Sequence, residues 1–465
     1  MSESIFNKYN NIHFIGIGGI GMSALAQICH KIGLTVTGSD ISRNEITDKL
    51  EQTGIKVFPE HNSSNLGSSE AVVYSSAIKK ENPEFAMAKE NNIPIFHRSE
   101  ILREIISKYK SIAVSGTHGK TTVSAMIACV LGDGGIDPTA LIGGYVRELD
   151  GNTCIGDGEW LVAEADESDG SFLNLSPDMI VITNIEHDHV DFYKDASQVE
   201  KAFTKFLNEN LQDGNAILCR DDLKVVEIAG NSKKKITWYG THDEAFIGLK
   251  SYTPGTETSK AVITKGGNIW GEINFRIPGK TNALNALAAL AVGDLLGLDF
   301  EVMAKTLENF SGVKRRQEVK GKVKDILFLD DYGHHSTEIR LTLEALRDKY
   351  PGRQVVIFQP HRYSRTLQMA KDFADALRTS DIVAITDVYS AGEPRIEGVS
   401  GKNIFNYGEN DWLYLPEEKD VLSELPGLLK PGDVFITMGA GDVYTYGEKI
   451  MEILEKELCV NNSSS

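Results

Sequence analysis

The sequence predicts an α/β protein of three domains, each a mainly parallel sheet with helices, and three observations lead to this prediction. The chain has 465 residues, enough for about three domains of ordinary size. Short apolar, β-prone segments alternate with segments of helical periodicity, as in parallel sheets. Polar or glycine-rich residues follow the predicted strands, where ligands of open α/β sheets bind. We expect domains at residues 1–108, 109–313 and 314–460, and a disordered polar tail at 461–465.

The composition is typical of a soluble globular protein, with 41% hydrophobic and 25% charged residues. A net charge of −18 argues against non-specific binding to nucleic acids or to anionic membranes, so an anionic substrate needs local clusters of Lys and Arg. No apolar run of about 18 residues is present to span a membrane. Five scattered cysteines without a C-x-x-C pair favour reduced thiols and a cytoplasmic location. The sequence leaves open whether the chain acts alone or as a homodimer.

An anion-binding turn is predicted at the start of the second domain. The apolar strand 111–114 is followed by a small glycine-containing turn and by a helical segment at 123–131. Backbone N–H groups of the turn, the helix dipole and the charge of Lys120 together attract phosphates, and Thr121 stands where a P-loop hydroxyl coordinates Mg²⁺. The spacing is shorter than the full P-loop pattern, since Val114 takes the place of its first glycine. We predict that this turn is the phosphate-binding loop of a P-loop domain. The alternative is an ordinary strand-to-helix turn. The residues expected at the phosphates of ATP are Gly116, Thr117, His118, Gly119, Lys120, Thr121 and Thr122.

The first domain begins with a complete G-x-G-x-x-G motif at residues 16–21, between a strand and a helix. Asp40 ends the next strand about 20 residues further on, as in Rossmann-like domains that bind NAD. A UDP-sugar offers the same pyrophosphate and ribose groups, so NAD and a UDP-sugar both remain open here, as does a purely structural turn. Two later strands of this domain end in polar residues at the ligand edge: Ser75, Ser76, His97 and Arg98. Ordinary loop polarity is the alternative, and it is the one that we favour for the two serines.

Two clusters of carboxylates and imidazoles follow strands of the second domain. Glu164 follows the strand 160–163 directly, and residues 186–189 (Glu-His-Asp-His) follow the strand 179–183. Such groups at strand ends beside a P-loop suit a divalent cation, and oxygen ligands favour Mg²⁺. We rank Glu164 first as a ligand because of its place at the end of the strand. The acids that follow it are interpreted as a solvated loop: Asp166, Glu167 and Asp169.

Polar residues also mark the end of the second domain and the third domain. A helix from about residue 280 carries Asn282 and Asn285, whose spacing places both amides on one face. A basic cluster at 314–316 comes next. Two predicted strands then run into residues 330–335 and 359–365, which contain histidine, arginine and aspartate. The third domain is therefore expected to be Rossmann-like, with a ligand edge of its own.

Eight of these segments together resemble the Mur ligase family: GIGGIGMSALA, SGTHGKTT, EADESDGSF, NIEHDHVD, PGKTNALNALAA, KRR, DDYGHH and QPHRYSRT. They run in order from about residue 12 to 445, and the set is far more specific than any one segment. The resemblance implies a ligase of peptidoglycan precursor synthesis that uses ATP and Mg²⁺, with two ions. It also implies that L-alanine is joined to the carboxylate of UDP-N-acetylmuramic acid through an acyl phosphate. The first domain would then bind the UDP-sugar rather than NAD.

The resemblance also assigns roles by motif. The UDP-sugar would contact Gly18, Gly19, Ile20, Gly21, Met22, Ser23, Asp40, Ser75, Ser76 and Arg98. Beyond the phosphate turn, ATP would contact Asn282, Asn285, Arg316 and Asp331. The metal ligands would be Thr121, Glu164 and His189. L-alanine and the transferring phosphate would lie among Tyr332, His334, His361, Arg362 and Arg365. The catalytic groups would be Lys120, Glu164, His189, Arg316 and His334.

The chain departs from the family pattern at a few positions. Ser336 stands where proline is usual, and Gln317 where an aromatic residue is common. Several Mur ligases carry a carbamylated lysine at the place of Phe203, where this chain has no lysine. Two other functions stay in view. A recycling ligase would join a tripeptide to the same sugar acid. An NAD-dependent oxidoreductase would rest on the first glycine motif alone.

Overall fold

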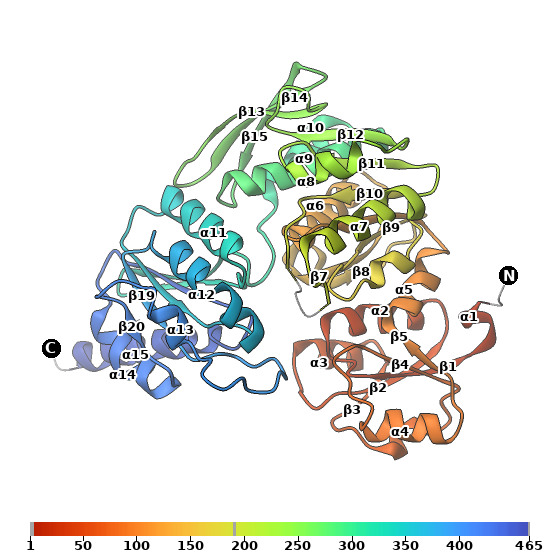
Figure 1. The fold of residues 1–465 in the computed structure, drawn as a ribbon, viewed down its shortest axis with the longest axis horizontal. Helices are drawn as coiled ribbons and strands as arrows, with labels where there is room; N and C mark the ends of the chain where they lie inside the picture. Colours follow the sequence, from red (N-terminus) through yellow and green to blue (C-terminus); the bar gives the residue numbers. More distant parts are fainter. Residues whose placement is uncertain (1–3, 189–191, 464–465) are drawn as a thin grey trace. The chain divides into compact units, whose positions relative to one another are not determined.

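Three sheets organise the chain in the computed structural model, which describes residues 4–188 and 192–463 (Figure 1). The first sheet has five parallel strands in the order β3-β2-β1-β4-β5. This order places the carboxyl ends of β1 and β4 at the switch point of the sheet, where such folds bind ligands. The strands in that order are β3 (Lys56–Phe58), β2 (Thr35–Ser39), β1 (Asn11–Ile15), β4 (Ala71–Tyr74) and β5 (Ile95–His97). The helices are α1 (Ile5–Lys8), α2 (Ile20–Lys31), α3 (Glu45–Gln52), α4 (Pro83–Glu90) and α5 (Arg98–Ile106).

The second sheet has ten strands and positions the predicted phosphate turn. Its strands in spatial order are β15 (Asn268–Phe275), β14 (Ser259–Lys265), β13 (Ile247–Thr253), β12 (Lys235–Gly240), β11 (Asn215–Cys219), β10 (Met179–Ile182), β6 (Lys110–Ser115), β9 (Trp160–Glu164), β7 (Thr139–Val146) and β8 (Gly151–Cys154). The strands from β13 to β7 pair in parallel, and β8 is antiparallel to β7. The strand β6 therefore lies between β10 and β9, and their carboxyl ends share one edge. The helices are α6 (Lys120–Asp133), α7 (Ala196–Lys205), α8 (Leu223–Ala229), α9 (Lys280–Leu295) and α10 (Phe300–Asn309).

The third sheet has six strands, with β16 antiparallel to β17 and the other pairs parallel. Its strands in order are β16 (Glu318–Val323), β17 (Ile326–Asp331), β21 (Val434–Met438), β18 (Gln354–Phe358), β19 (Ile382–Ile385) and β20 (Leu413–Tyr414). The helices are α11 (Ser336–Lys349), α12 (Tyr363–Leu377), α13 (Lys402–Phe405), α14 (Glu418–Leu428) and α15 (Tyr444–Ser463). Three mainly parallel sheets with helices confirm the predicted fold class.

The chain divides into two compact units. The first consists of Met1–Leu249, Ile263–Gly271 and Leu284–Leu307, and the second of Lys250–Val262, Glu272–Ala283 and Glu308–Ser465. In the first unit, one hydrophobic cluster includes Phe14 of β1, Ala113 of β6 and Phe172 beyond β9, so the first two sheets share packed side chains. The predicted boundaries at 108/109 and 313/314 stay predictions.

The end of the chain differs from the expectation. Helix α15 continues through residues 461–463, which the sequence predicted to be part of a disordered tail. Adding a residue to an existing helix orders one residue and forms one more backbone hydrogen bond. A polar sequence can therefore extend a helix that has already formed. Residues 464 and 465 lie outside the described part of the chain. Among the described residues, none of the helices has the length and apolarity needed to cross a bilayer.

Candidate active site

The turn between β6 and α6, residues 116–119, is here called the phosphate loop. Gly116 has φ +130°, and a Cβ built on it would lie 2.1 Å from Thr183 Oγ1, so no other residue fits without a shift. Gly119 precedes the first residue of α6 in the left-handed conformation, with φ +84°. The first turn of α6 contains no acidic residue, and its N–H groups have no partner within the helix. The geometry provides the helix N-terminus that an anion site needs.

Lys120 lies at the centre of this site. Its Nζ donates to the carbonyl oxygens of Gly116 at 2.6 Å and Thr117 at 3.2 Å, and it lies 2.9 Å from Glu167 Oε2. Burial disfavours the charge on Lys120, but the carboxylate of Glu167 and those of two neighbouring acids outweigh it and raise the pKa of Lys120 above its usual value. The lysine is therefore a permanent cation next to the phosphate loop.

The interpretation of the acids after β9 as a solvated loop was wrong for Glu167. Glu167 is 1% exposed and pairs with Lys120. Asp166 Oδ2 lies 3.5 Å from Arg98 Nη2, and Asp169 Oδ2 accepts a hydrogen bond from Ser76 Oγ at 3.1 Å. The physical reason is that a buried lysine requires a buried counter-ion, which only a nearby carboxylate can supply. The acid cluster directly after a strand beside the P-loop was the signal that the sequence offered.

Two of the three predicted metal ligands are brought together. Thr121 Oγ1 donates to Glu164 Oε2 at 3.0 Å, and the N–H of Gly143 on β7 donates to the same oxygen at 2.9 Å. A Cβ at Gly143 would lie 2.3 Å from Glu164 Oε2, so the glycine leaves the space that this carboxylate occupies. A hydroxyl and a carboxylate are the oxygen donors that Mg²⁺ prefers, and this pair fits such an ion. His189, the third predicted ligand, lies outside the described residues.

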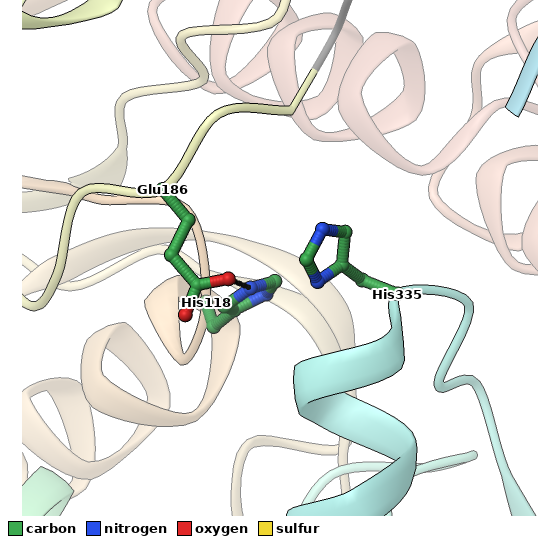
Figure 2. Close-up of side chains that lie close together, drawn as sticks. All are labelled: His118, Glu186 and His335. Carbon is green, nitrogen blue, oxygen red and sulfur yellow. Dashed lines mark hydrogen bonds and ion pairs between the residues drawn. The ribbon is translucent and has the colours of Figure 1, made fainter. Parts of the chain in front are cut away.

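Residues after β10 bind the phosphate loop and were not predicted to do so. Asn184 Oδ1 accepts from the N–H of His118 at 2.8 Å, and the N–H of Glu186 donates to Thr117 Oγ1 at 2.8 Å. Figure 2 shows the Glu186 carboxylate facing the His118 ring, with 3.4 Å between Oε2 and Nε2. Because this segment is far from the loop in sequence, no local pattern reveals the contact.

The two asparagines of α9 have different surroundings. A Cβ at Gly119 would lie 3.0 Å from Asn285 Oδ1, so Asn285 lies against the phosphate loop, as its predicted role in ATP binding requires. Asn282 Nδ2 donates to the carbonyl of Pro278 at 2.7 Å and to Gln317 Oε1 at 3.2 Å. Asn285 is therefore placed at the loop itself.

The predicted UDP-sugar residues gather at the carboxyl edge of the first sheet. Asp40 Oδ2 accepts from the N–H of Gly18 at 2.9 Å, which connects the end of β2 to the glycine turn. A Cβ at Gly21 would lie 3.4 Å from Arg98 Nη1, so the guanidinium lies beside the start of α2. The other predicted residues follow β1 or β4, with Met22 and Ser23 buried and Ile20 and Ser76 exposed: Gly19, Ile20, Met22, Ser23, Ser75 and Ser76.

In the second unit, the two adjacent arginines just before β16 differ in role. Arg315 is bound by Asp330 at 2.9 Å and by the carbonyls of Gly439 and Gly441, so it fixes the backbone. Arg316 lies with its guanidinium carbon 5.2 Å from the centre of the Tyr332 ring and is 30% exposed. The predicted substrate contact, Arg316, is thus the more accessible of the two.

Asp331 is buried at the end of β17. Its oxygens accept from the N–H groups of Gln317 at 2.8 Å and Gly333 at 2.7 Å. Burial raises the pKa of Asp331 to about 6, against the opposing effect of Arg316. Gln317, a departure from the family pattern, therefore supplies a backbone bond to Asp331. Ser336, another departure, is the first residue of α11, after the N-cap His335.

Aromatic and imidazole rings line the predicted alanine site. The ring centres of His334 and His361 are 5.8 Å apart, Tyr332 lies 5.4 Å from His334, and His361 stacks on Tyr389. Burial and the charges of Arg365 and Arg362 lower the pKa of His361 to about 4, so this imidazole is neutral at pH 7. Arg362 has φ +69° at the start of α12, a backbone conformation that is strained for a non-glycine residue and typical of functional sites.

Comparison with known proteins covers nearly the whole chain. The Mur ligase family catalytic domain matches residues 11–110, the Mur ligase middle domain residues 114–293, and the Mur ligase glutamate ligase domain residues 315–441. A UDP-N-acetylmuramate–L-alanine ligase of Geotalea uraniireducens is 43% identical over 458 residues, covering 98% of this chain and 100% of that protein.

Solved structures agree with the sequence comparison. The crystal structure of UDP-N-acetylmuramate-alanine ligase from Thermotoga maritima has a TM-score of 0.83 at 31% identity, covering 96% of this chain and 99% of that one. A murein peptide ligase from Psychrobacter arcticus has a TM-score of 0.72 at 23% identity, covering 96% and 98%, and at this identity it shows the fold alone. On the matched domain models and the full-length identity, the chain belongs to the Mur ligase family.

Proposed function

We propose that this protein is an ATP-dependent ligase that joins L-alanine to the carboxylate of UDP-N-acetylmuramic acid in peptidoglycan precursor synthesis. The observation that carries the proposal is the pairing of a charged, buried Lys120 with a phosphate loop, next to the Thr121–Glu164 oxygen pair. The similarity to an alanine ligase over the full length supports the choice of substrates. The four cysteines whose side chains the structure describes are free and three of them are buried, which suits a cytoplasmic enzyme.

The reaction has two chemical steps. A carboxylate oxygen of the sugar acid forms a bond to the γ-phosphorus of ATP, the bond from that phosphorus to the β–γ bridging oxygen breaks, and ADP leaves. The alanine amine then forms a bond to the acyl carbon and loses a proton to a base. Phosphate leaves with one oxygen of the original carboxylate. Both reactants of the first step are anions, so charge stabilisation and positioning are the main tasks of the protein.

Residues of the central domain, 109–313, would bind ATP. Lys120 would release its contacts with Glu167 and the loop carbonyls to hold the β- and γ-phosphates, and Asn285 would border the nucleotide. Thr121, Glu164 and His189 would hold Mg²⁺, and two ions would neutralise charge on the triphosphate. Residues 1–108 would bind the UDP-sugar through the glycine turn, Asp40 and Arg98.

Residues of the C-terminal domain, 314–460, would bind L-alanine. Arg362 and Arg365 are proposed to bind its carboxylate, since arginine matches carboxylates in bidentate geometry. Arg316 would stabilise the transferring phosphate. His334 is proposed as the base for the amine rather than His361, because a pKa near 4 leaves His361 with little affinity for a proton.

The nearest rival is a ligase that adds a tripeptide to the same sugar acid. The chemistry of the two is the same, and only the occupant of the C-terminal site differs. An NAD-dependent oxidoreductase would explain the glycine turn, but it would leave the Lys120 site without a role.

A substrate assay separates these functions. With Mg-ATP and UDP-N-acetylmuramate, we expect phosphate release that depends on L-alanine. Activity on glycine should be weaker because it lacks a methyl group worth about 1–3 kcal/mol, and activity on serine should be weaker because its added hydroxyl fits a small apolar pocket less well. The tripeptide L-alanyl-γ-D-glutamyl-diaminopimelate serves as the matched competitor. Activity with the tripeptide and none with L-alanine would favour the recycling ligase. Binding of NAD without any ATP-dependent phosphate release would favour the oxidoreductase.

A further inference from the structure

We infer that Asn184 is a positioning residue for the phosphate loop and that it sets the affinity of this loop for ATP. The inference rests on the proposed function, since it concerns the triphosphate of that reaction. Asn184 directly follows Thr183, beyond the end of β10, the strand that pairs with β6. It is half-buried and comes from a part of the chain more than 60 residues away from the loop.

Asn184 makes three hydrogen bonds to two adjacent loop residues. Its Oδ1 accepts from the N–H of His118 at 2.8 Å, and its Nδ2 donates to the carbonyl of the same residue at 3.0 Å. Its backbone carbonyl accepts from the N–H of Thr117 at 3.0 Å. A side-chain amide that binds both the N–H and the C=O of one residue fixes the orientation of that peptide segment.

The neighbours of Asn184 add to these contacts. Thr183 Oγ1 donates to the carbonyl of His118 at 2.6 Å. Asp222, the N-cap of α8, accepts from the N–H of Ile185 at 3.3 Å and from the N–H of Val225 at 2.8 Å. The segment that carries Asn184 is thus bound on its far side to the start of α8, which gives it a defined position from which to hold the loop.

The hydrogen bonds of Asn184 divide the amides of the turn into two groups. The N–H groups of Thr117 and His118 donate to Asn184, so they are directed away from an anion at the helix. The amides at the start of α6, residues 119–122, then form the group that faces a phosphate. The carbonyl of His118 accepts hydrogen bonds from Asn184 Nδ2 and from Thr183 Oγ1. Holding this carbonyl dipole away from the phosphates removes a repulsion that would otherwise weaken binding.

The experiment compares Asn184→Ala with a matched asparagine of the same unit. In Asn184→Ala the two side-chain bonds to His118 are lost and the backbone bond to Thr117 is kept. The KM for ATP should rise about tenfold, the scale of two lost hydrogen bonds, while the KM values for the sugar acid and L-alanine stay within about twofold. The control is Asn210→Ala, because Asn210 Nδ2 also donates twice, at 2.7 Å each, to the carbonyls of Leu173 and Leu175. Asn210→Ala should lower the melting temperature about as much as Asn184→Ala does, but it should leave the KM for ATP unchanged.

A second variant and a second readout keep the test decisive. Asn184→Asp has the same shape and keeps the acceptor for His118 N–H, but it replaces the donor with a charge that repels phosphate, so ATP binding should again weaken. Mg-ATP affinity is measured by calorimetry as well as by kinetics. An unchanged ATP affinity in both variants, or an equal loss in Asn210→Ala, would overturn the role of Asn184. A wild-type protein that binds Mg-ATP but forms no amide would count against the proposed function, and the calorimetric comparison would still decide the role of Asn184.

Discussion

The Lys120→Ala variant should release phosphate about 10²–10³-fold more slowly than the wild type, a loss of roughly 3–4 kcal/mol of transition-state stabilisation. The reason is that Lys120 is a full positive charge at the start of α6, and its carboxylate partners keep it protonated. When a sugar carboxylate approaches a triphosphate, this charge offsets the repulsion between the two anions. Steady-state phosphate release with saturating Mg-ATP, UDP-N-acetylmuramate and L-alanine measures the effect.

A double variant separates catalysis from stability at Lys120. Removing the lysine alone leaves Glu167, which is 1% exposed, as an uncompensated buried carboxylate, and this costs about 3–5 kcal/mol of folding stability. Lys120→Met with Glu167→Gln removes both charges and should restore the free energy of unfolding but not the activity. If the double variant regained near-normal kinetics, Lys120 would have only a structural role, and the account of the phosphate loop would fail.

The Glu164→Gln variant should raise the Mg²⁺ concentration needed for half-maximal activity at least about tenfold and lower the maximal rate. Glutamine keeps the shape and the acceptor for the N–H of Gly143, but it removes the negative charge next to Thr121 Oγ1. A magnesium titration of phosphate release measures the change, and full loss of activity in a chelator with recovery on added Mg²⁺ is expected for the wild type.

The control for Glu164 is Glu159→Gln, which lies just before the same strand and is 65% exposed beside Lys110. This substitution removes an equal charge from the surface and should leave the magnesium dependence unchanged. A wild-type enzyme with full activity in the chelator, or a Glu164→Gln variant with the wild-type titration curve, would show that the Thr121–Glu164 pair holds no catalytic ion.

The phosphate loop was predictable from sequence because its parts are contiguous. A strand, a glycine turn, Lys120 and a helix occur within about 20 residues, and each has a local signal. The edge position of Glu164 was equally predictable, since the carboxyl ends of parallel strands share one side of a sheet. The same argument placed Asp40, Arg98 and Asp331 at the ends of their strands.

The contacts that depend on tertiary packing were missed. Glu167 was expected to be solvated, and only the folded chain reveals that it pairs with Lys120. Asn184 was part of a recognised segment, but its hydrogen bonds to His118 join residues 66 positions apart. Burial and partner choice are properties of the assembled sheet, and periodicity along one strand does not carry them. The extension of α15 beyond residue 460 likewise depends on propagation of an existing helix rather than on the composition of the tail.

The most direct test of an acyl phosphate made at the phosphate loop is the fate of the carboxylate oxygens. UDP-N-acetylmuramate labelled with ¹⁸O in its carboxylate is converted with Mg-ATP and L-alanine, and the released phosphate is analysed by mass spectrometry. Our account predicts one ¹⁸O atom in each phosphate, because the oxygen that attacks the γ-phosphorus leaves with it. Amide formation with unlabelled phosphate would contradict the account.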